Sequence, residues 1–285
     1  MSKIRKQQII IIGAVILLIG FLFTRDIKGL VKEQEQNPAA TATQQPVAAQ
    51  IDLQSVSATA KNLISNATAK EITSLENTYK SASGAEKLKL GKQLAQKWDD
   101  LEQSVPSALY LEQVAQNESS LNNWVLAGER LLKAFDNTQD SIIKPAMLQK
   151  ANLAFEKAIS IDSASADAKT GLGITIVNGM GAPMQGIAML MDVVKKDPKN
   201  FKANMNLGTF ALKSGQFDKA ATRFENIIKD IKATPDAYFY LGTAYENLGK
   251  NREAIDAYQH SKKLAANPTL SNFIDKKIAE LKNKI

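Results

Sequence analysis

The residue types that usually carry enzymatic chemistry are scarce in this chain. Its 285 residues include one histidine, His260, and no cysteine. General acid–base catalysis and metal binding use clusters of histidine, cysteine or paired carboxylates, while disulfides, thiol nucleophiles and thiolate ligands require cysteine. His260 follows Tyr258 on an expected helix, where an exposed position accounts for it. We therefore expect no catalytic site, no cofactor and no metal.

Two glycine-containing stretches resemble phosphate-binding loops but fail their requirements. The run Gly171–Gly173 is similar to the start of a dinucleotide loop, but Ile176 stands where the third glycine is needed and no strand precedes it. Gly249-Lys250 is similar to the end of a phosphate loop, but Asn251 stands where a hydroxyl residue is needed. Packing between helices explains these glycines better than nucleotide binding does.

Glycines in the C-terminal half recur with a fixed period. A leucine precedes three glycines spaced 35 and 34 residues apart, namely Gly173, Gly208 and Gly242. A second series, spaced 34 residues apart, comprises Gly181, Gly215 and Gly249. Five residues beyond each member of the second series stands a small residue, and four further on a large one: Gly186 with Leu190, Ala220 with Phe224, and Ala254 with Tyr258. A period of this length indicates stacked helix pairs.

The spacing has a packing explanation. In each pair, the leucine–glycine step on the first helix and the small residue on the second let two backbones approach closely, and the large residue fills the remaining gap. One apolar face of each pair is still uncovered, so the pairs must stack in an array. This architecture favours binding over catalysis.

The same residues carry a resemblance to the tetratricopeptide repeat family. The family's pattern is matched by Tyr238, Leu241-Gly242, Tyr245, Ala254 and Tyr258, followed by Pro268. The match is strongest between residues 200 and 267. The resemblance implies an α-α superhelix of helical hairpins. Together with a single transmembrane helix predicted at the N-terminus from its apolar run, this gives an all-α fold.

The chain divides into segments of distinct character. In order they are a basic tail (1–8), a transmembrane signal anchor (9–24), a flexible linker (25–50), an irregular helical region (51–117), a degenerate hairpin (118–165), three repeats (166–199, 200–233 and 234–267) and a capping helix (268–285). The degenerate hairpin carries Trp124 and Gly128 on its first helix and an insertion around Asp136 to Pro145. The turn Asn178 to Gly181 gives the first full repeat one extra residue. Asn267-Pro268 predicts the start of the capping helix.

The irregular region from 51 to 117 does not fit the repeat pattern. One apolar stripe is expected before a break at Ser81–Gly84, and its members are Val56, Ala60, Leu63, Ala67, Ile72, Leu75 and Tyr79. A second helix follows over Leu90–Leu101, and Pro106 opens a third. The region is either an irregular cap on the first repeat or a self-associating coiled-coil stripe, and its short length favours the cap.

The N-terminal segment predicts a membrane anchor. Ile9 to Phe23 is an uninterrupted apolar run with basic residues on both sides. At ~1.5 Å per residue the run spans about 22 Å, shorter than a hydrocarbon core of roughly 30 Å, so it also suits a signal peptide. However, the run ends in Thr24-Arg25-Asp26 and lacks a nearby small-x-small cleavage site. We favour an uncleaved signal anchor over a removed peptide.

Charge gives limited information about location. Basic residues flank the apolar run evenly: Lys3, Arg5 and Lys6 before it, and Arg25, Lys28 and Lys32 after it. Because the leading tail carries only basic charges, we expect a bacterial inner-membrane protein with its repeats in the periplasm. The alternative is a cytosol-facing receptor on an organelle membrane. The net charge of +7 is interleaved with acidic residues, so no nucleic-acid stripe is expected.

The family resemblance implies a concave groove lined by first helices. The groove positions are Thr170, Ile174, Asn178, Lys202, Met205, Asn206, Thr209, Lys213, Asp236, Phe239, Tyr240, Thr243 and Glu246. Phe239 and Tyr240 are candidate anchors for a partner unless they pack within the array, and Asn178 and Asn206 are candidate donors to a partner backbone. Some family members clamp a C-terminal carboxylate with Lys and Asn where this chain has Met205 and Thr209, which argues against that ligand.

These observations predict a membrane-anchored scaffold or adaptor that binds a protein partner or peptide in its groove at the cell envelope. The partner's identity and the oligomeric state stay open. One competing interpretation is a structural subunit of a permanent membrane-associated complex, with the groove filled by a fixed partner or by residues 51–117. Another is an enzyme or enzyme regulator whose site is not recognisable from its residues.

Overall fold

The computed structural model describes residues 51–180, 182–265 and 267–285. The expected basic tail, signal anchor and linker, 1–50, lie outside the described residues. All described residues belong to one unit, Ala48–Ile285. None of the helices formed by these residues combines the length and the apolar character that a membrane span requires.

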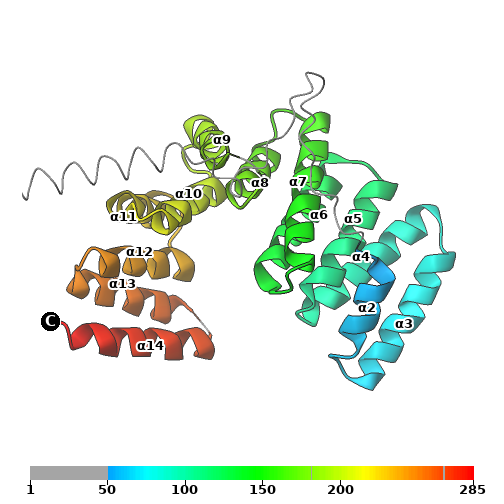
Figure 1. Ribbon diagram of the computed structural model, residues 1–285, viewed down its shortest axis with the longest axis horizontal. Coiled ribbons are helices and arrows are strands. Elements are labelled where there is room, and N and C mark those ends of the chain that lie inside the picture. The colour runs from blue at the N-terminus through cyan, green and yellow to red at the C-terminus, as the bar shows by residue number, and fades with distance from the viewer. Residues whose placement is uncertain (1–50, 181, 266) are drawn as a thin grey trace, which may run out of the picture. The chain divides into compact units, whose positions relative to one another are not determined.

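The described residues form helices and turns without strands (Figure 1). The α-helices are α2 (Leu53–Lys61), α3 (Asn66–Ser81), α4 (Gly84–Asp100), α5 (Ser104–Asn117), α6 (Leu121–Asn137), α7 (Ile143–Ile161), α8 (Ala166–Val177), α9 (Pro183–Lys196), α10 (Phe201–Lys213), α11 (Phe217–Asn226), α12 (Pro235–Asn247), α13 (Asn251–Leu264) and α14 (Pro268–Lys282). A single π-helical turn, η1 (Ile227–Ile231), extends α11.

Consecutive helices from α6 onward pack as hairpins, and each hairpin packs on the next. The pairs are α6 with α7, α8 with α9, α10 with α11, and α12 with α13, and the links between them join α7 to α8, α9 to α10, α11 to α12, and α13 to α14. This succession is visible in Figure 1 as adjacent antiparallel helices. It confirms the prediction of an all-α, tetratricopeptide-like solenoid within the described part of the chain.

The periodic glycines lie where the large residues of the second helices press against the first helices. A Cβ on Gly208 would come within 2.6 Å of Phe224 Cζ, and a Cβ on Gly242 within 2.7 Å of Tyr258 Cδ1. A Cβ on Gly173 would likewise lie 3.1 Å from Leu190 Cγ. The predicted packing rule, in which a large side chain fills the space above a glycine, is therefore confirmed.

The ends of the repeat helices follow from local chemistry. Asn200, Thr234 and Asn267 cap α10, α12 and α14, because each side-chain oxygen accepts a hydrogen bond from a backbone N–H in the first turn. The first helices of two hairpins are followed by Gly215 and Gly249, with φ angles of +73° and +71°. Glycine adopts this left-handed conformation without strain, which permits the tight turn into the second helix.

The region 51–117 contains one helix more than its apolar stripe predicts. The expected continuous stripe is divided between α2 and α3, and Leu63 in the intervening turn is 71% exposed. The reason is a competing helix start: Ser65 Oγ accepts a hydrogen bond from Thr68 N at 3.2 Å and caps α3. The prediction that Leu63 and Ala67 belong to a buried stripe is wrong, because both are exposed.

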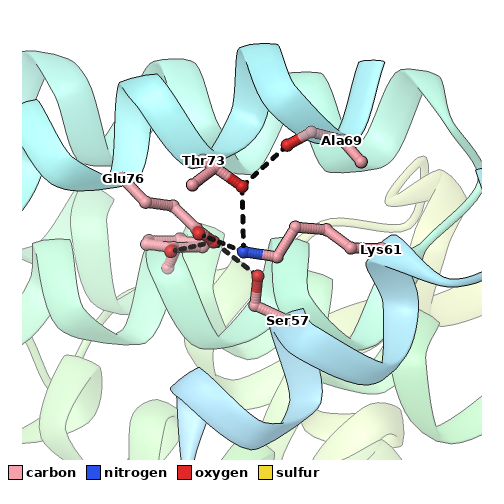
Figure 2. A network of polar contacts seen from close by, with 6 residues as sticks. Ser57, Lys61, Ala69, Thr73 and Glu76 are labelled. Carbon is pink, nitrogen blue, oxygen red and sulfur yellow. Dashed lines mark hydrogen bonds and ion pairs between the residues drawn. The ribbon is translucent and has the colours of Figure 1, made fainter. Parts of the chain in front are cut away.

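A buried carboxylate connects three helices of this region (Figure 2). Glu76 on α3 accepts hydrogen bonds from Ser57 on α2, from Tyr110 OH on α5 at 3.0 Å, and from Lys61 Nζ on α2 at 2.6 Å. Lys61 Nζ also donates to Thr73 Oγ1 at 3.4 Å. Burial opposes the ionisation of Glu76, but its hydrogen bonds and the Lys61 charge outweigh burial and hold its pKa below the usual value.

The insertion expected around Asp136 to Pro145 is shorter than the sequence suggests. α6 continues through Asp136, and α7 begins at Ile143. Asp140 Oδ1 accepts hydrogen bonds from Ile142 N and Ile143 N at 2.8 and 2.9 Å, which starts α7 before the proline. Pro145 lies in the first turn, where a missing N–H costs nothing.

Candidate functional site

The predicted groove residues are carried by the first helices of three successive hairpins. Five lie along α10, five along α12 and three on or just after α8. α8 contacts α10, and α10 contacts α12, so the faces of these helices form one surface. We call this the first-helix surface, and the structure adds residues of α6 and α14 to it.

Two predicted groove residues are interior instead. The side chain of Thr170 is fully buried, and Ile174 belongs to the hydrophobic core. The cause is that α8 is enclosed on two sides, because Phe155 of α7 presses on Gly171 and Leu190 of α9 presses on Gly173. Thr170 and Ile174 are therefore corrected from groove residues to core residues.

The two asparagines expected to meet a partner are partly committed to their own helices. Asn178 is the C-cap of α8, and its Nδ2 donates to Ile174 O at 3.0 Å. Asn206 Nδ2 donates to Lys202 O at 2.8 Å, and Thr209 Oγ1 donates to Asn206 O at 2.9 Å. These bonds fix the two side chains along α10 and leave the side-chain Oδ1 of Asn206 as an acceptor for a ligand.

An ion pair crosses the first-helix surface between hairpins that are not adjacent in sequence. Lys202 Nζ on α10 lies 2.5 Å from Glu129 Oε1 on α6. Both side chains keep more than a third of their surface exposed. Surface pairs of this kind contribute little stability, so a partner's charged group can compete for either member at small cost.

The structure adds Asp136 to the surface. Burial raises the pKa of Asp136, while the positive charges of Lys213 and Lys144 act in the opposite direction. The pKa of Tyr240 is also raised, first by burial and then by the negative charges of Asp236 and Asp136. Asp136 is thus near enough to Lys213 on α10 and Tyr240 on α12 for its charge to affect, or be affected by, these groups. The apolar period of α6 continues through Phe135, so the sequence could have placed Asp136 on this helix rather than in an insertion.

Aromatic side chains form a strip from α12 to α14. Tyr240 stacks on the buried ring of Phe224, with centroids 5.5 Å apart and planes at 24°. Phe239 lies 5.8 Å from Tyr240, 5.6 Å from Tyr258 and 6.0 Å from Phe273. Phe239 and Tyr240 are thus half-buried within the array and half open to solvent. Phe273 on α14 is 48% exposed.

The C-terminal end of the surface is held by a second polar network. Glu246 accepts hydrogen bonds from Tyr258 OH at 2.8 Å and from Lys277 Nζ at 2.9 Å. Burial opposes the ionisation of Glu246, but these donors and the Lys277 charge hold its pKa below the usual value. Thr243 Oγ1 donates to Phe239 O at 3.1 Å. Thr243 Oγ1 also lies 3.2 Å from Tyr258 OH on α13, so Thr243 and Glu246 both contact the neighbouring helices.

The remaining predicted positions are more accessible. Asp236 and Lys213 are exposed, and the ammonium of Lys213 lies 5.5 Å from the centroid of the Phe210 ring. Met205 is half-buried against the core beneath α10 and α12. The open part of the first-helix surface is thus an aromatic and apolar strip bordered by charges of both signs.

The chemistry of this surface is that of recognition. No group of three His, Cys, Asp or Glu side chains suited to a metal ion occurs in the described ranges. His260 is exposed on α13 and meets the ring of Tyr238 edge-on, with centroids 5.1 Å apart. Aromatic rings that are partly packed and partly open bind apolar side chains well, because their conformations are already fixed.

The fold and the surface define a class: a helical-hairpin repeat scaffold of the kind that mediates protein–protein interaction. Residues 205–268 match the model of the tetratricopeptide repeat family. The match covers α12 and α13 and most of the preceding hairpin. It supports the repeat assignment where the sequence pattern is strongest.

Known proteins agree with this class. Anaphase-promoting complex subunit 3 of Dictyostelium discoideum is 33% identical over 127 residues, which make up 44% of this chain and 13% of that protein. A tetratricopeptide repeat protein from Parabacteroides merdae has a similar structure, with a TM-score of 0.58, 10% identity, and coverage of 80% of this chain and 82% of that chain. A thermophilic tetratricopeptide repeat protein of Thermus thermophilus gives a TM-score of 0.55, 13% identity, and coverage of 67% and 99%.

Proposed function

We propose that this protein is a membrane-anchored adaptor that holds a segment of a partner protein against its first-helix surface at the cell envelope. The observation that carries the proposal is the strip of Phe239, Tyr240 and Phe273, whose rings are fixed by mutual contacts yet remain partly open. Rigid aromatic side chains of this kind are typical anchors of protein interfaces. The exposed Lys213 and Asp236 border the strip and can orient a charged partner.

The membrane part of the proposal rests on the apolar run Ile9 to Phe23 and its basic flanks. We place the repeats in the periplasm of a bacterial cell, on the basis of the purely basic leading tail. In this arrangement the anchor concentrates the adaptor at the membrane, where it recruits its partner.

The proposal favours a partner from outside the chain over self-occupation by residues 51–117. In the described ranges, no hydrogen bond or ion pair joins these residues to α8, α10 or α12. Their polar contacts with later helices go instead to α6 and α7, for example from Asp99 to Lys133 and from Glu112 to Lys150.

Site-specific crosslinking in cells tests this proposal. A photoreactive residue replaces Lys213, which is exposed, because Tyr240 is stacked on Phe224 and its replacement would disturb the core. The matched control replaces Lys284, which is equally exposed near the C-terminus. We expect a discrete partner captured from the membrane fraction at Lys213 and absent at Lys284.

The identity of the crosslinked product separates the alternatives. A partner with a known compartment also reports the orientation of the repeats. Crosslinks that occur only within the chain would contradict the adaptor proposal, as would the same products from both positions. A partner that stays bound in fixed stoichiometry through purification would support the permanent structural subunit instead.

A further inference from the structure

A second groove lies between the second helices α9 and α11 and has α10 as its floor. It encloses a cavity of about 710 Å³. Its lining residues from α10 include Asn204, Leu207 and Ala211, whereas Lys202, Asn206 and Lys213 belong to the first-helix surface. At 100° per residue these two sets occupy different faces of α10. We call this cavity the seam groove, and it is independent of the proposed partner site.

One wall of the seam groove is apolar and open to solvent. Met184, Ile187 and Met191 lie at helical spacing on one side of α9, and the first and last are 74% and 56% exposed. Leu207 and Phe210 form a buried apolar floor. Flexible, polarizable methionines adapt to varied apolar side chains, so exposed methionines over a preformed floor suit a binding surface.

The other wall, on α11, carries Asp218, Lys219 and Arg223. Arg223 on α11 is half-buried, and its Nη1 donates to Asn204 Oδ1 at 2.8 Å. Within the described part of the chain, Arg223 forms no ion pair with a carboxylate. The acceptor Asn204 is itself fixed, because its Nδ2 donates to Pro198 O at 3.0 Å and to Asn200 O at 2.9 Å. The guanidinium is therefore held in place beside the cavity with donors to spare.

Several other partly buried cations in the described helices form ion pairs, although Lys87, Lys144 and Lys169 do not. Each of the following is paired with a carboxylate: Arg130 with Asp99, Lys150 with Glu112, Lys61 with Glu76, and Lys277 with Glu246. Removing a cation from water is costly unless an anion compensates it. Arg223 is thus a fixed, partly buried guanidinium next to an apolar wall, and it is free to pair with an anion that a ligand supplies.

We propose that the seam groove binds a segment of a partner protein that presents bulky aliphatic side chains to Met184 and Met191 and a carboxylate to Arg223. A carboxylate accepts two parallel hydrogen bonds from a guanidinium, which fixes both the position and the direction of the bound segment. The aliphatic side chains cover the methionines and the floor. A cavity of this volume accommodates a few side chains, which suits a short linear segment.

Selection from a random twelve-residue peptide library tests the proposal. The library is presented to the full 285-residue chain in detergent micelles, and binders of the R223M variant are removed. The R223M variant keeps an unbranched, apolar side chain and removes the charge and its hydrogen-bond donors. We expect enriched peptides that carry a glutamate or aspartate within one helical turn of two large aliphatic residues.

A double-mutant cycle with one enriched peptide then measures the interaction between Arg223 and the acidic residue of the peptide. Replacing the peptide's glutamate by glutamine should weaken binding to the wild-type chain about tenfold, and should have no further effect on R223M. The M191K variant should weaken binding by a similar factor, while L153K, at an exposed leucine of α7, should not. M191K keeps the test valid if R223M does not fold, as judged by circular dichroism.

Three outcomes would overturn the proposal. The first is enrichment of peptides that lack an acidic residue. The second is binding that is insensitive to both R223M and M191K. The third is loss of binding in a variant of the first-helix surface, such as F273A, while the groove variants still bind. Crosslinking of residue 191 to a second copy, or to residues 1–50 of the same chain, would also exclude a partner segment as the occupant.

Discussion

Replacing Gly208 with alanine tests the packing between the two helices of a hairpin. Helix propensity alone predicts a higher free energy of unfolding, whereas overpacking predicts a lower one. Gly208 lies inside α10, and alanine at such a position normally stabilises a helix by about 0.5–1 kcal/mol. Here, however, the new Cβ would lie 2.6 Å from Phe224 Cζ, and Phe224 is fully buried and cannot move aside freely. We expect Gly208→Ala to lower the free energy of unfolding by about 1–3 kcal/mol, as overpacking does in other cores.

A double-mutant cycle attributes this loss to the named contact. Phe224→Leu shortens the side chain, so it should destabilise the chain alone but relieve the clash in combination with Gly208→Ala. The expected coupling energy is about 1 kcal/mol or more in favour of the double variant. Unfolding in urea, followed by helical circular dichroism on the full chain, measures all four proteins. A Gly208→Ala variant as stable as the wild type, or more stable, would refute the reasoning.

Three further predictions concern the polar contacts. Glu76→Gln weakens the charged hydrogen bonds to Ser57, Lys61 and Tyr110, and should lower the free energy of unfolding by about 2–3 kcal/mol at pH 7; an unchanged urea midpoint would contradict this. The pKa of Glu76 is lower in the folded chain than in the unfolded chain. Its ionised form therefore stabilises the fold above the unfolded pKa, and this stabilisation is lost as pH falls through the folded pKa. The free energies of unfolding of the wild type and Glu76→Gln, measured as a function of pH, should converge at low pH. Lys202→Ala should change stability by less than about 1 kcal/mol, because its ion pair is largely solvated, and a larger loss in the same urea assay would show that the pair holds the surface together.

The repeat architecture could be read from the sequence because its determining contacts are local. Gly208 meets Phe224, and Gly242 meets Tyr258, within one hairpin, so a fixed spacing records each contact directly. The helix caps at Asn200 and Asn267 are also local, since each side chain bonds a backbone N–H three residues on.

The errors arose where the outcome depends on neighbouring hairpins. Thr170 and Ile174 were expected on the open face of α8, but Phe155 of the preceding hairpin closes on Gly171 and encloses that helix. No pattern within α8 records this contact. Asp136 was missed because Lys213 and Tyr240, with which its charge interacts, lie about two and three repeats further along the sequence.

Leu63 illustrates a different limit. Its apolar side chain fits the period of a longer helix, and only the competing cap at Ser65 ends that helix early. The aromatic strip was found in part, because Phe239 and Tyr240 followed from the repeat pattern. Phe273 joins the strip through its contact with Phe239, which lies on another helix, so no spacing within the repeats records it.

The central claim is that the first-helix surface binds the partner through its aromatic strip. The most direct test is the affinity of the partner segment captured at Lys213 for the Phe273→Ala variant, measured by isothermal titration calorimetry. The matched control is Leu153→Ala on α7, because these two side chains are 48% and 44% exposed and both lose apolar surface. We predict a loss of roughly tenfold or more for Phe273→Ala, corresponding to ~1.4 kcal/mol, and no change for Leu153→Ala. Equal affinities for the two variants would contradict the claim.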